Sequence, residues 1–452
     1  MLIHLPYDKS VIRLELPDQT TVLRSTYPRG IFSAEVLLMQ AINKPIAAPS
    51  LAKVLQNRRP GKVVVVVSDV TRPIPYVQFL PRLLQELIAG GIAADDILLL
   101  IAAGMHRPSY EAERIEMFGQ EIANSFAIVD HRAEADDLIE LPQKSWAGAV
   151  VKLNRLLMEA GFRLLIGLVE PHFMAGFSGG RKAICPGLAS LETIRQFHGY
   201  SFLANEHADI AQLEHNPCHL EALSVAKTVG IDFSINVVLN DERQTVAVFA
   251  GDLEQSHLDA CEFVRRHANP LIEQVFDVVV TSSGGYPLDA TFYQCVKSMV
   301  YALPAVKKDG SIISVGGCSE GIGSREYQDL MFRYAGDWQS FIRDISCSES
   351  VCKDQWQFQL HARALKKIGQ EHLYFITHAL PQEILLKLSV SGITTDQVQT
   401  TLQQQIDRAA AQGLSVCAIP EGPYCAPIGH AFQESEVRGQ EIMNGPRINT
   451  YE

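Results

Sequence analysis

The sequence predicts an α/β protein of two domains, each with a mainly parallel sheet flanked by helices. Two observations lead to this fold class. Short apolar, β-branched runs alternate with helical segments, which is the pattern of parallel strands buried on both faces. Polar and glycine-rich clusters follow several of these runs, as they do in open α/β sheets, where ligands bind beyond the carboxyl ends of the strands.

The first predicted strand covers 62–68, with the sequence KVVVVVS. A helix follows it, with Leu83, Leu84, Leu87 and Ile88 on one stripe and Gly90-Gly91 as its end. Further strands are predicted over 97–103, 164–169, 276–281, 311–315, 373–377 and 415–419.

A new series of strand, loop and helix begins after 265–275. We therefore expect a first α/β domain over 1–270 and a second α/β domain over 271–414. The segment 415–452 is loop-rich after its strand. We expect it to return to the first domain.

Composition narrows the function classes. The 452 residues include 39 Lys and Arg against 51 Asp and Glu, a net charge of −12, which argues against nucleic-acid binding. No apolar run reaches the roughly 18 residues of a membrane span, and the N-terminus MLIHLPYDKS does not resemble a signal peptide. The nine cysteines are scattered and form no CxxC motif, which predicts reduced thiols and a cytoplasmic protein.

Four polar clusters directly follow predicted strands. They are DVTRPIP at 69–75, GMHRP at 104–108, EPHFMAGFSGGRK at 170–182 and SGGYPLD at 283–289. One such cluster is ordinary turn chemistry, whereas four at equivalent strand ends predict a shared cleft between the two domains that contains the active site.

The first three clusters hold candidates for anion binding and proton transfer. Asp69, Thr71 and Arg72 either brace the following helix or form an anion site with the arginine fork. His106 and His172 could each be a structural histidine. Two of them at equivalent strand ends favour a proton-transfer pair.

The loop at 176–182 resembles a phosphate cradle through Ser178, Gly179 and Gly180. Counted from Gly176, it fails the P-loop pattern, because Arg181 stands where a second Gly is required and Ala183 where Ser or Thr is required; no GxGxxG occurs elsewhere. Lys182, beside Arg181, is either a nucleophile with a lowered pKa or half of a surface basic pair.

Other polar residues allow two interpretations. His198, at the end of a predicted helix, is a surface residue or a metal ligand. The segment 215–219 looks metal-like, but its Asn-Pro pair favours a helix start. Asp289 is predicted to cap a helix running to 303. Gln294 and Lys297 share a face of that helix, which either is solvated or binds a carboxylate.

Together these motifs resemble the nickel-dependent lactate racemase family. The resemblance runs in order from about residue 60 to about residue 420. Its segments are DVTRPIP at 69–75, GMHR at 104–107, PHFMAGFSGGRK at 171–182, His198, QCVK at 294–297 and Trp356-Gln357.

The resemblance implies a cofactor and a role for each matching residue. The cofactor is the nickel-pincer nucleotide, pyridinium-3-thioamide-5-thiocarboxylic acid mononucleotide with Ni(II), made and loaded by cofactor-biosynthesis and nickel-insertion enzymes. Lys182 would hold it covalently, His198 would ligate nickel, and His106 and His172 would be the acid–base pair. The remaining expected contacts are Asp69, Thr71, Ser178, Gly179 and Gly180 to the cofactor, and Arg72, Gln294, Lys297, Tyr293 and Trp356 to the substrate.

The implied reaction is racemisation or epimerisation of a 2-hydroxy acid, lactate-like or sugar-derived. Moving the α-hydrogen as hydride avoids a dianion, and one base for each enantiomer accounts for two histidines. Two alternatives stay open: a zinc-dependent hydrolase built on His106, His172 and His198, and a non-catalytic protein that binds an anion or nucleotide.

Overall fold

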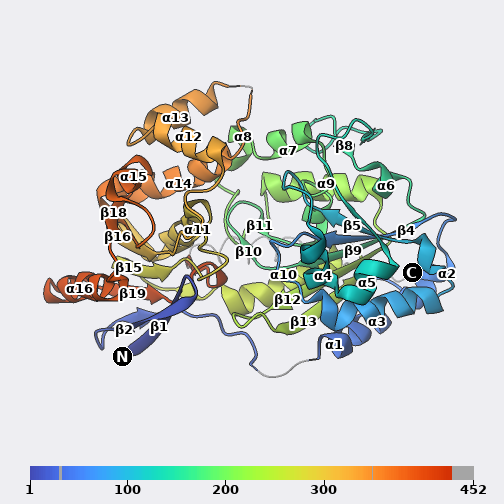
Figure 1. Ribbon diagram of the computed structural model, residues 1–452, viewed down its shortest axis with the longest axis horizontal. Helices are drawn as coiled ribbons and strands as arrows, with labels where there is room; N and C mark the ends of the chain where they lie inside the picture. Colours follow the sequence, from blue (N-terminus) through green and yellow to red (C-terminus); the bar gives the residue numbers. More distant parts are fainter. Residues whose placement is uncertain (30–32, 349, 430–452) are drawn as a thin grey trace, which may run out of the picture. The chain divides into compact units, whose positions relative to one another are not determined.

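The computed structural model describes residues 1–29, 33–348 and 350–429 of the chain (Figure 1). It forms two compact units. Unit 1 comprises Met1–Ser25, Asn269–Cys347 and the chain from Gln357 onward, and unit 2 comprises Thr26–Ala268 and Ser348–Trp356. Each unit holds a six-stranded, mainly parallel sheet with helices packed on it, so the predicted fold class is confirmed.

The units differ from the expected domains at both ends of the chain. The first 25 residues belong to unit 1, where β3 (Thr21–Val22) pairs with β19 (Val416–Ile419). The described part of the predicted C-terminal segment, 415–429, therefore lies in unit 1 and not with the first domain; 430–452 lie outside the described residues. Pairing between segments so distant in sequence leaves no local signal.

The sheet of unit 2 has the order β13-β12-β9-β4-β5-β6. Its strands are β4 (Val63–Ser68), β5 (Ile97–Ala102), β6 (Ala127–Asp130), β9 (Phe162–Leu168), β12 (Phe233–Leu239) and β13 (Thr245–Gly251). All pairings are parallel except that of β12 with β13. The order reverses between β4 and β9, and the carboxyl ends at such a reversal are the usual ligand position.

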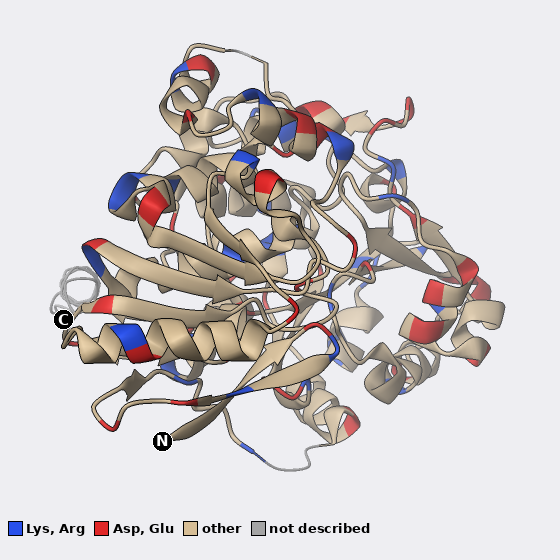
Figure 2. Cartoon of the chain, turned by 60° about the vertical axis from the view of Figure 1, so that its left-hand side comes forward, with Lys and Arg blue, Asp and Glu red and all other residues tan. Residues whose placement is uncertain are grey.

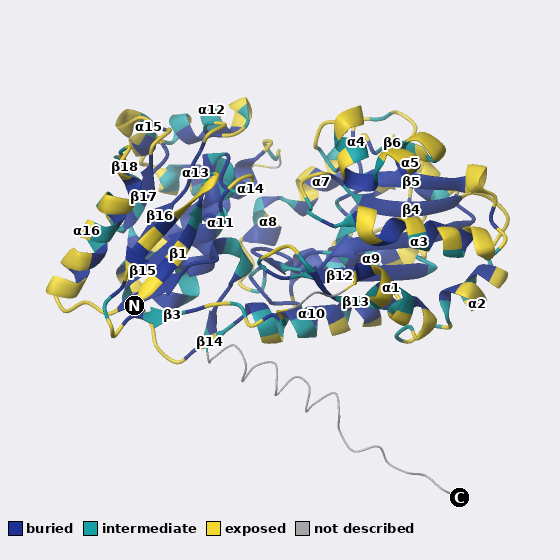
Figure 3. Ribbon diagram, turned by 60° about the horizontal axis from the view of Figure 1, so that its bottom comes forward, coloured by how far each residue is buried: buried dark blue, intermediate teal, exposed yellow. Residues whose placement is uncertain are grey.

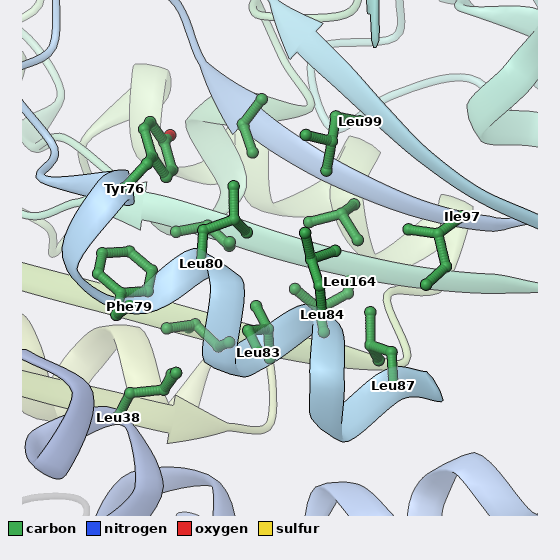
Figure 4. Close-up of a cluster of buried hydrophobic side chains, with 14 of the residues drawn as sticks. Leu38, Tyr76, Phe79, Leu80, Leu83, Leu84, Leu87, Ile97, Leu99 and Leu164 are labelled. Carbon is green, nitrogen blue, oxygen red and sulfur yellow. The ribbon is translucent and has the colours of Figure 1, made fainter. Parts of the chain in front are cut away.

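One face of this sheet carries the main core of unit 2, on which α1 (Ala34–Asn43), α2 (Leu51–Gln56) and α3 (Tyr76–Ala89) pack (Figure 4). The predicted stripe of α3 is buried at Leu83, Leu84 and Leu87, but Ile88 is 44 % exposed. The helix ends at Gly90 as predicted. The strands β4 and β5 are almost entirely buried (Figure 3).

The other face of β9 contacts the short turn η2 (Gly180–Ala183). A Cβ atom at Gly167 of β9 would lie 2.9 Å from the backbone nitrogen of Gly180, so only glycine lets this turn approach the strand. Nearby, α10 (Gln255–Ala268) packs on β12 and β13. These contacts fix the turn that contains Lys182.

The sheet of unit 1 is parallel throughout, in the order β18-β17-β16-β15-β19-β3. Its other strands are β15 (Phe276–Ser282), β16 (Val306–Val315), β17 (Leu373–Thr377) and β18 (Ser391–Thr394). The hairpin of β1 (Leu2–Tyr7) and β2 (Ser10–Glu15) shares one core with the sheet and with α16 (Val398–Ala411), while α11 (Phe292–Ala302) contacts β15 and β16.

The turn of this hairpin lies at the carboxyl ends of the unit 1 strands. The backbone N–H of Asp8 and that of Gly317 donate to Oδ2 of buried Asp289, over 2.7 and 2.9 Å. The prediction that Asp289 caps the next helix is therefore wrong. The cap of α11 is Thr291, because the carboxylate of Asp289 already binds two other backbone groups.

Further helices and strands complete the two units. They are α4 (Glu111–Phe118), α5 (Gln120–Ser125), β7 (Ile139–Glu140), β8 (Lys152–Leu153), α6 (Arg155–Met158), β10 (Pro171–His172), β11 (Gly176–Phe177), α7 (Leu191–Phe197), α8 (Tyr200–Leu203), α9 (Pro217–Val229), β14 (Leu271–Ile272), α12 (Arg325–Arg333), α13 (Trp338–Ser346), α14 (Gln355–Ile368), α15 (Gln382–Lys387) and β20 (Ile428–Gly429).

Charged residues gather on helices and loops and are sparse on the strands (Figure 2). All nine cysteines are free thiols, and seven of them are buried. Among the described helices, none combines the length and the apolar character needed to cross a lipid bilayer.

Candidate active site

Three loops of unit 2 follow the carboxyl ends of β4, β5 and β9. Asp69 comes directly after β4, and His106 lies in the turn after β5. Because β4 and β5 are adjacent and parallel, their loops meet, and Nδ1 of His106 lies 2.5 Å from Oδ2 of Asp69. The two loops therefore build one carboxylate–imidazole pair.

Asp69 is held as an ionised acceptor. Its Oδ1 accepts from the backbone N–H and the hydroxyl of Thr71, over 3.2 and 2.6 Å. Burial raises the pKa of Asp69, but the hydrogen bonds and charge of His106, with Thr71 and Arg72, outweigh burial and leave it below its usual value. The carboxylate does not cap α3, which begins after Pro75.

This pairing fixes the tautomer of His106. A carboxylate only accepts, so the proton shared with Asp69 sits on Nδ1, and Nε2 of a neutral ring keeps its lone pair. The side chain of His106 is 61 % exposed. His106 can therefore accept a proton at Nε2, with Asp69 stabilising the resulting cation.

Arg72 and Glu170 connect the loops after β4 and β9. The closest approach of Nη1 of Arg72 to Oε1 of Glu170 is 3.9 Å, with about one third of each side chain exposed. This distance is too long for a hydrogen bond, so the pair does not saturate the guanidinium fork. The planar donors of Arg72 suit an additional carboxylate.

His172 and Lys182 form the second close pair. Nδ1 of His172 accepts from the backbone N–H groups of Met174 and Ala175, over 3.3 and 3.4 Å, and its Nε2 lies 2.8 Å from Nζ of Lys182. With the lone pair on Nδ1, the proton of the neutral ring lies on Nε2. Nε2–H then donates to Lys182, whose amine must accept and is therefore neutral.

The surroundings of Lys182 also favour the neutral amine. Burial lowers the pKa of Lys182 well below its usual value, and the charges of Arg72 and Arg181 lower it further. A neutral amine is the nucleophilic form of lysine. The surroundings of Lys182 therefore favour a nucleophile over half of a surface basic pair.

The residues before Lys182 form a compact turn. The hydroxyl of Ser178 donates to the carbonyl oxygen of Leu168 over 2.7 Å. Gly179 has a φ of 74°, and a Cβ there would lie 2.9 Å from the same oxygen; a Cβ at Gly180 would lie 2.6 Å from the ring of His257. These contacts give Ser178 and both glycines a structural role, and their predicted contact with a cofactor stays a prediction.

His198 is prepared as a neutral ligand. It follows the last residue of α7, and its Nδ1 donates to the carbonyl oxygen of Ile194 over 2.8 Å, which leaves the lone pair on Nε2. Burial lowers the pKa of His198 to about 4. The ring of Trp356 lies beside it, with centroids 4.6 Å apart. A neutral imidazole of this kind suits a metal ion.

The structure does not support either of the two metal sites that the sequence left open, the one built on three histidines and the one at 215–219. Within residues 1–29, 33–348 and 350–429, no three His, Cys, Asp or Glu side chains are arranged to hold a metal ion. His106, His172 and His198 therefore do not form a zinc site. The Asn-Pro start at 216–217 is confirmed, because Asn216 caps α9 by accepting from the N–H groups of Cys218 and His219.

The other predicted substrate ligands lie on α11 of unit 1. Tyr293, Gln294 and Lys297 occupy its first turns, each partly exposed. The ring of Tyr293 packs edge-on against Tyr327, with centroids 5.1 Å apart. Their predicted contact with substrate stays a prediction.

Sequence reasoning missed one histidine that contacts this site. His257 of α10 touches the turn before Lys182, with its Nε2 2.9 Å from the carbonyl oxygen of Ser178. It follows no predicted strand and belongs to no motif, so no local signal marks it. Its position depends on a tertiary contact between α10 and the turn.

Comparisons with known proteins agree with these observations. The family model described as the lactate racemase N-terminal domain matches residues 7–211, and that of the lactate racemase C-terminal domain matches residues 272–424. The lactate racemase of Thermoanaerobacterium thermosaccharolyticum is 35% identical over 80% of this chain and 85% of its own. That of Lactiplantibacillus plantarum is 30% identical over 93% of this chain and 98% of its own.

Two solved structures are similar in fold. The lactate racemase apoprotein of T. thermosaccharolyticum superimposes with a TM-score of 0.86 at 31% identity, covering 94% of this chain and 100% of that one. A protein of Thermotoga maritima superimposes with a TM-score of 0.63 at 18% identity, covering 84% of this chain and 96% of that one, and shares the fold alone.

Proposed function

The chain belongs to the lactate racemase family, and on this premise we propose that it interconverts the enantiomers of lactate or of a closely similar 2-hydroxy acid. One observation carries the proposal: Nζ of Lys182 lies 2.8 Å from Nε2 of His172. This contact joins a neutral amine that can bind a cofactor covalently to an imidazole that can exchange protons. His106 supplies a second imidazole, bound to Asp69.

The residues of unit 2 fit the nickel-pincer nucleotide that the resemblance implies. Lys182, with its lowered pKa, suits a covalent bond through its nitrogen. His198, with a lone pair on Nε2 and a pKa of about 4, suits nickel as a neutral ligand. When bound, the group would supply an acceptor for the α-hydrogen of the substrate as hydride.

The chain itself would handle the proton and the carboxylate. His106 would accept the hydroxyl proton at Nε2 while Asp69 stabilises the imidazolium. His172 would serve the other enantiomer, since its Nε2 faces Lys182, the proposed point of attachment. Arg72 would bind the substrate carboxylate through its fork, and the resemblance adds Gln294 and Lys297 to this role.

The choice of substrate within the 2-hydroxy acids is a finer proposal. Phe173 and Met174 are buried beside His172, and Trp356 packs on His198. Apolar walls of this kind would suit a short side chain such as the methyl group of lactate. We also propose a cytoplasmic location, because nine free thiols are typical of a reducing compartment.

The test is to produce the chain together with enzymes that build and load the cofactor. The intact mass of the wild-type protein should then show an adduct that Lys182→Ala lacks, and only the wild-type protein should racemise L- and D-lactate. Lys144→Ala, at an exposed lysine of the same unit, is the matched control and should keep both properties. Racemisation by Lys182→Ala, or a wild-type protein without adduct, would contradict the proposal.

A further inference from the structure

Arg181 is a buried cation without a buried anion. Its side chain is 1 % exposed, and among the described residues no carboxylate lies within ion-pair distance of it. Burial lowers the pKa of Arg181 to about 10, which leaves it charged at neutral pH. Burying a charge is unfavourable unless its hydrogen bonds are satisfied, so the bonds that Arg181 makes indicate its role.

Most of these bonds go to the turn that contains Lys182. Nη2 of Arg181 donates to the carbonyl oxygen of Ala175 over 2.8 Å, and Nη1 approaches the carbonyl oxygens of Ser178 and Gly179 at 3.5 and 3.4 Å. One guanidinium thus ties the two ends of the segment 175–179 together. This segment includes β11, which pairs with the strand containing His172.

His257 holds this guanidinium in place from outside the turn. Its Nε2 lies 2.7 Å from Nη1 of Arg181. Burial and the charge of Arg181 keep the pKa of His257 well below its usual value, so the ring is neutral. The same Nε2 also lies 2.9 Å from the carbonyl oxygen of Ser178. Because a guanidinium only donates, the hydrogen bond with Arg181 requires the lone pair on Nε2, and the proton of the ring is then on Nδ1. The histidine is fixed in α10, which packs on the sheet and not on the turn alone.

The network reaches His172 through Ala175. The carbonyl oxygen of Ala175 accepts from Arg181, and its N–H points to Nδ1 of His172 at 3.4 Å. If Ala175 shifts, His172 loses a donor that places its lone pair on Nδ1. The proton on Nε2, which faces Lys182, is then no longer fixed.

We propose that Arg181, held by His257, is a positioning residue for His172 and Lys182. It fixes the turn so that backbone N–H groups meet Nδ1 of His172 and the ring presents Nε2–H to the amine. The catalytic meaning of this arrangement rests on the proposed function, whereas the arrangement itself can be measured in protein without cofactor.

The first test is spectroscopic and uses protein without cofactor, with histidines labelled by nitrogen-15. In the wild type, His172, assigned by its absence in His172→Gln, should give an unprotonated signal for Nδ1 and a protonated one for Nε2. In His257→Phe, which removes the imidazole acceptor of Arg181 and leaves only the carbonyl oxygens of the turn, the two signals should move toward each other as the tautomers mix. His257→Gln, which restores an acceptor, should return them toward the wild-type positions.

Two further variants separate positioning from simple destabilisation. Arg181→Lys keeps the charge but loses the fork, and should mix the tautomers as His257→Phe does, even if His257→Phe itself does not fold. His361→Phe removes another fully buried imidazole, in unit 1, and should leave the His172 signals unchanged. A folded Arg181→Lys or His257→Phe with wild-type His172 signals would overturn the proposal.

Kinetics of the loaded enzyme give a second readout. Removing a group that orients a metal-bound histidine typically lowers activity by 10-fold to 100-fold. By the same reasoning, His257→Phe should lower kcat by about 10-fold or more with KM nearly unchanged. An unchanged kcat in folded His257→Phe would also overturn the proposal. If the wild type racemises no hydroxy acid, the proposed function fails, while the nitrogen-15 signals still decide whether Arg181 positions His172.

Discussion

The two units use similar sheets in different ways at the ends of their strands. In each, the first long parallel strand lies inside the sheet, with later strands on both sides. In unit 2, the loops at the carboxyl ends of β4, β5 and β9 pair acidic and basic side chains with one another, as at Asp69 and His106. In unit 1, the corresponding ends bind the N-terminal hairpin, and buried Asp289 accepts from its backbone.

This difference shows that a polar residue at a strand end is not by itself a functional residue. Asp69 and Asp289 both follow buried strands and both accept two or more hydrogen bonds. Asp289 is fully buried and binds backbone groups that nothing else satisfies, whereas Asp69 binds an imidazole that is largely exposed. The partner of the carboxylate, rather than its place in the sheet, distinguishes the two roles.

The largest expected effect is a loss of activity on substitution of a histidine in unit 2. His172→Gln in the loaded enzyme should lower kcat for lactate racemisation by about 10³-fold, because it removes a proposed acid–base group. Thermal unfolding should change little, since the ring belongs to the candidate site and not to the main core. Racemisation assays in both directions, with intact mass to verify loading, measure this.

The matched variant in unit 1 is His378→Gln. His378 directly follows β17 and bonds with the hydroxyl of Tyr7 over 2.5 Å. It should lower the melting temperature and leave kcat near the wild-type value. Equal losses of kcat in the two variants would remove the distinction between the units.

The next effect is on stability and concerns unit 1. Asp289→Ala leaves the backbone N–H groups of Asp8 and Gly317 without their acceptor. At roughly 1 to 3 kcal/mol for each unsatisfied buried donor, we expect a loss of about 3 kcal/mol in the free energy of unfolding. Asp289→Asn keeps an oxygen in place, and burial raises the pKa of Asp289, so the neutral amide should lose far less. Urea denaturation that finds Ala and Asn equally stable would contradict this.

The smallest effect for any single residue is a pH dependence, which is concentrated in unit 2. Burial lowers the pKa of His131, His198, His219 and His257 there. The unfolded chain takes up protons near pH 6.5, whereas these folded rings do not, so stability falls as the pH drops below about 6.5. A ring that stays neutral contributes a loss of about 2 kcal/mol by pH 5. Hydrogen exchange at several pH values should show unit 2 opening first.

Substitution of His219 directly tests this loss of stability at low pH. Its pKa is lowered to about 3, first by burial and then by the charges of Arg181 and Lys227. His219→Asn should reduce the stability lost between pH 7 and pH 5, because one titrating group is gone. His215→Asn, at a side chain that is 70 % exposed, should leave that loss unchanged. A steep loss that persists in His219→Asn would assign the acid sensitivity to other groups.

The strands that consist of continuous apolar runs could be predicted from the sequence. β4, β5, β9, β15, β17 and β19 were found within about two residues, since both faces of each strand are apolar. β12 was missed, because Ser234 and Asn236 interrupt its run although both are fully buried. There the hydroxyl of Ser256 accepts from the amide of Asn236, a tertiary contact with no sequence pattern.

The site was predictable in part for a similar reason. Asp69, His106, His172 and Lys182 lie in the loops that follow apolar strands, so these loops could be recognised, and the structure brings the four residues into two pairs. Their chemical roles remain predictions. The burial of Arg181 could not be predicted, because an arginine beside a lysine normally indicates a surface, and its burial depends on an acceptor 76 residues away in sequence.

The pairing of β3 with β19 determines when, during synthesis, the sheet of unit 1 can finish folding. Thr21–Val22 emerge from the ribosome almost first, yet their partner strand is made only when residues 416–419 have been translated. Unit 2 draws nearly all of its residues from one continuous stretch, Thr26–Ala268, which is available much earlier. During synthesis, β3 therefore stays without its partner strand until almost the whole chain has been made, whereas the stretch that forms most of unit 2 is complete much earlier.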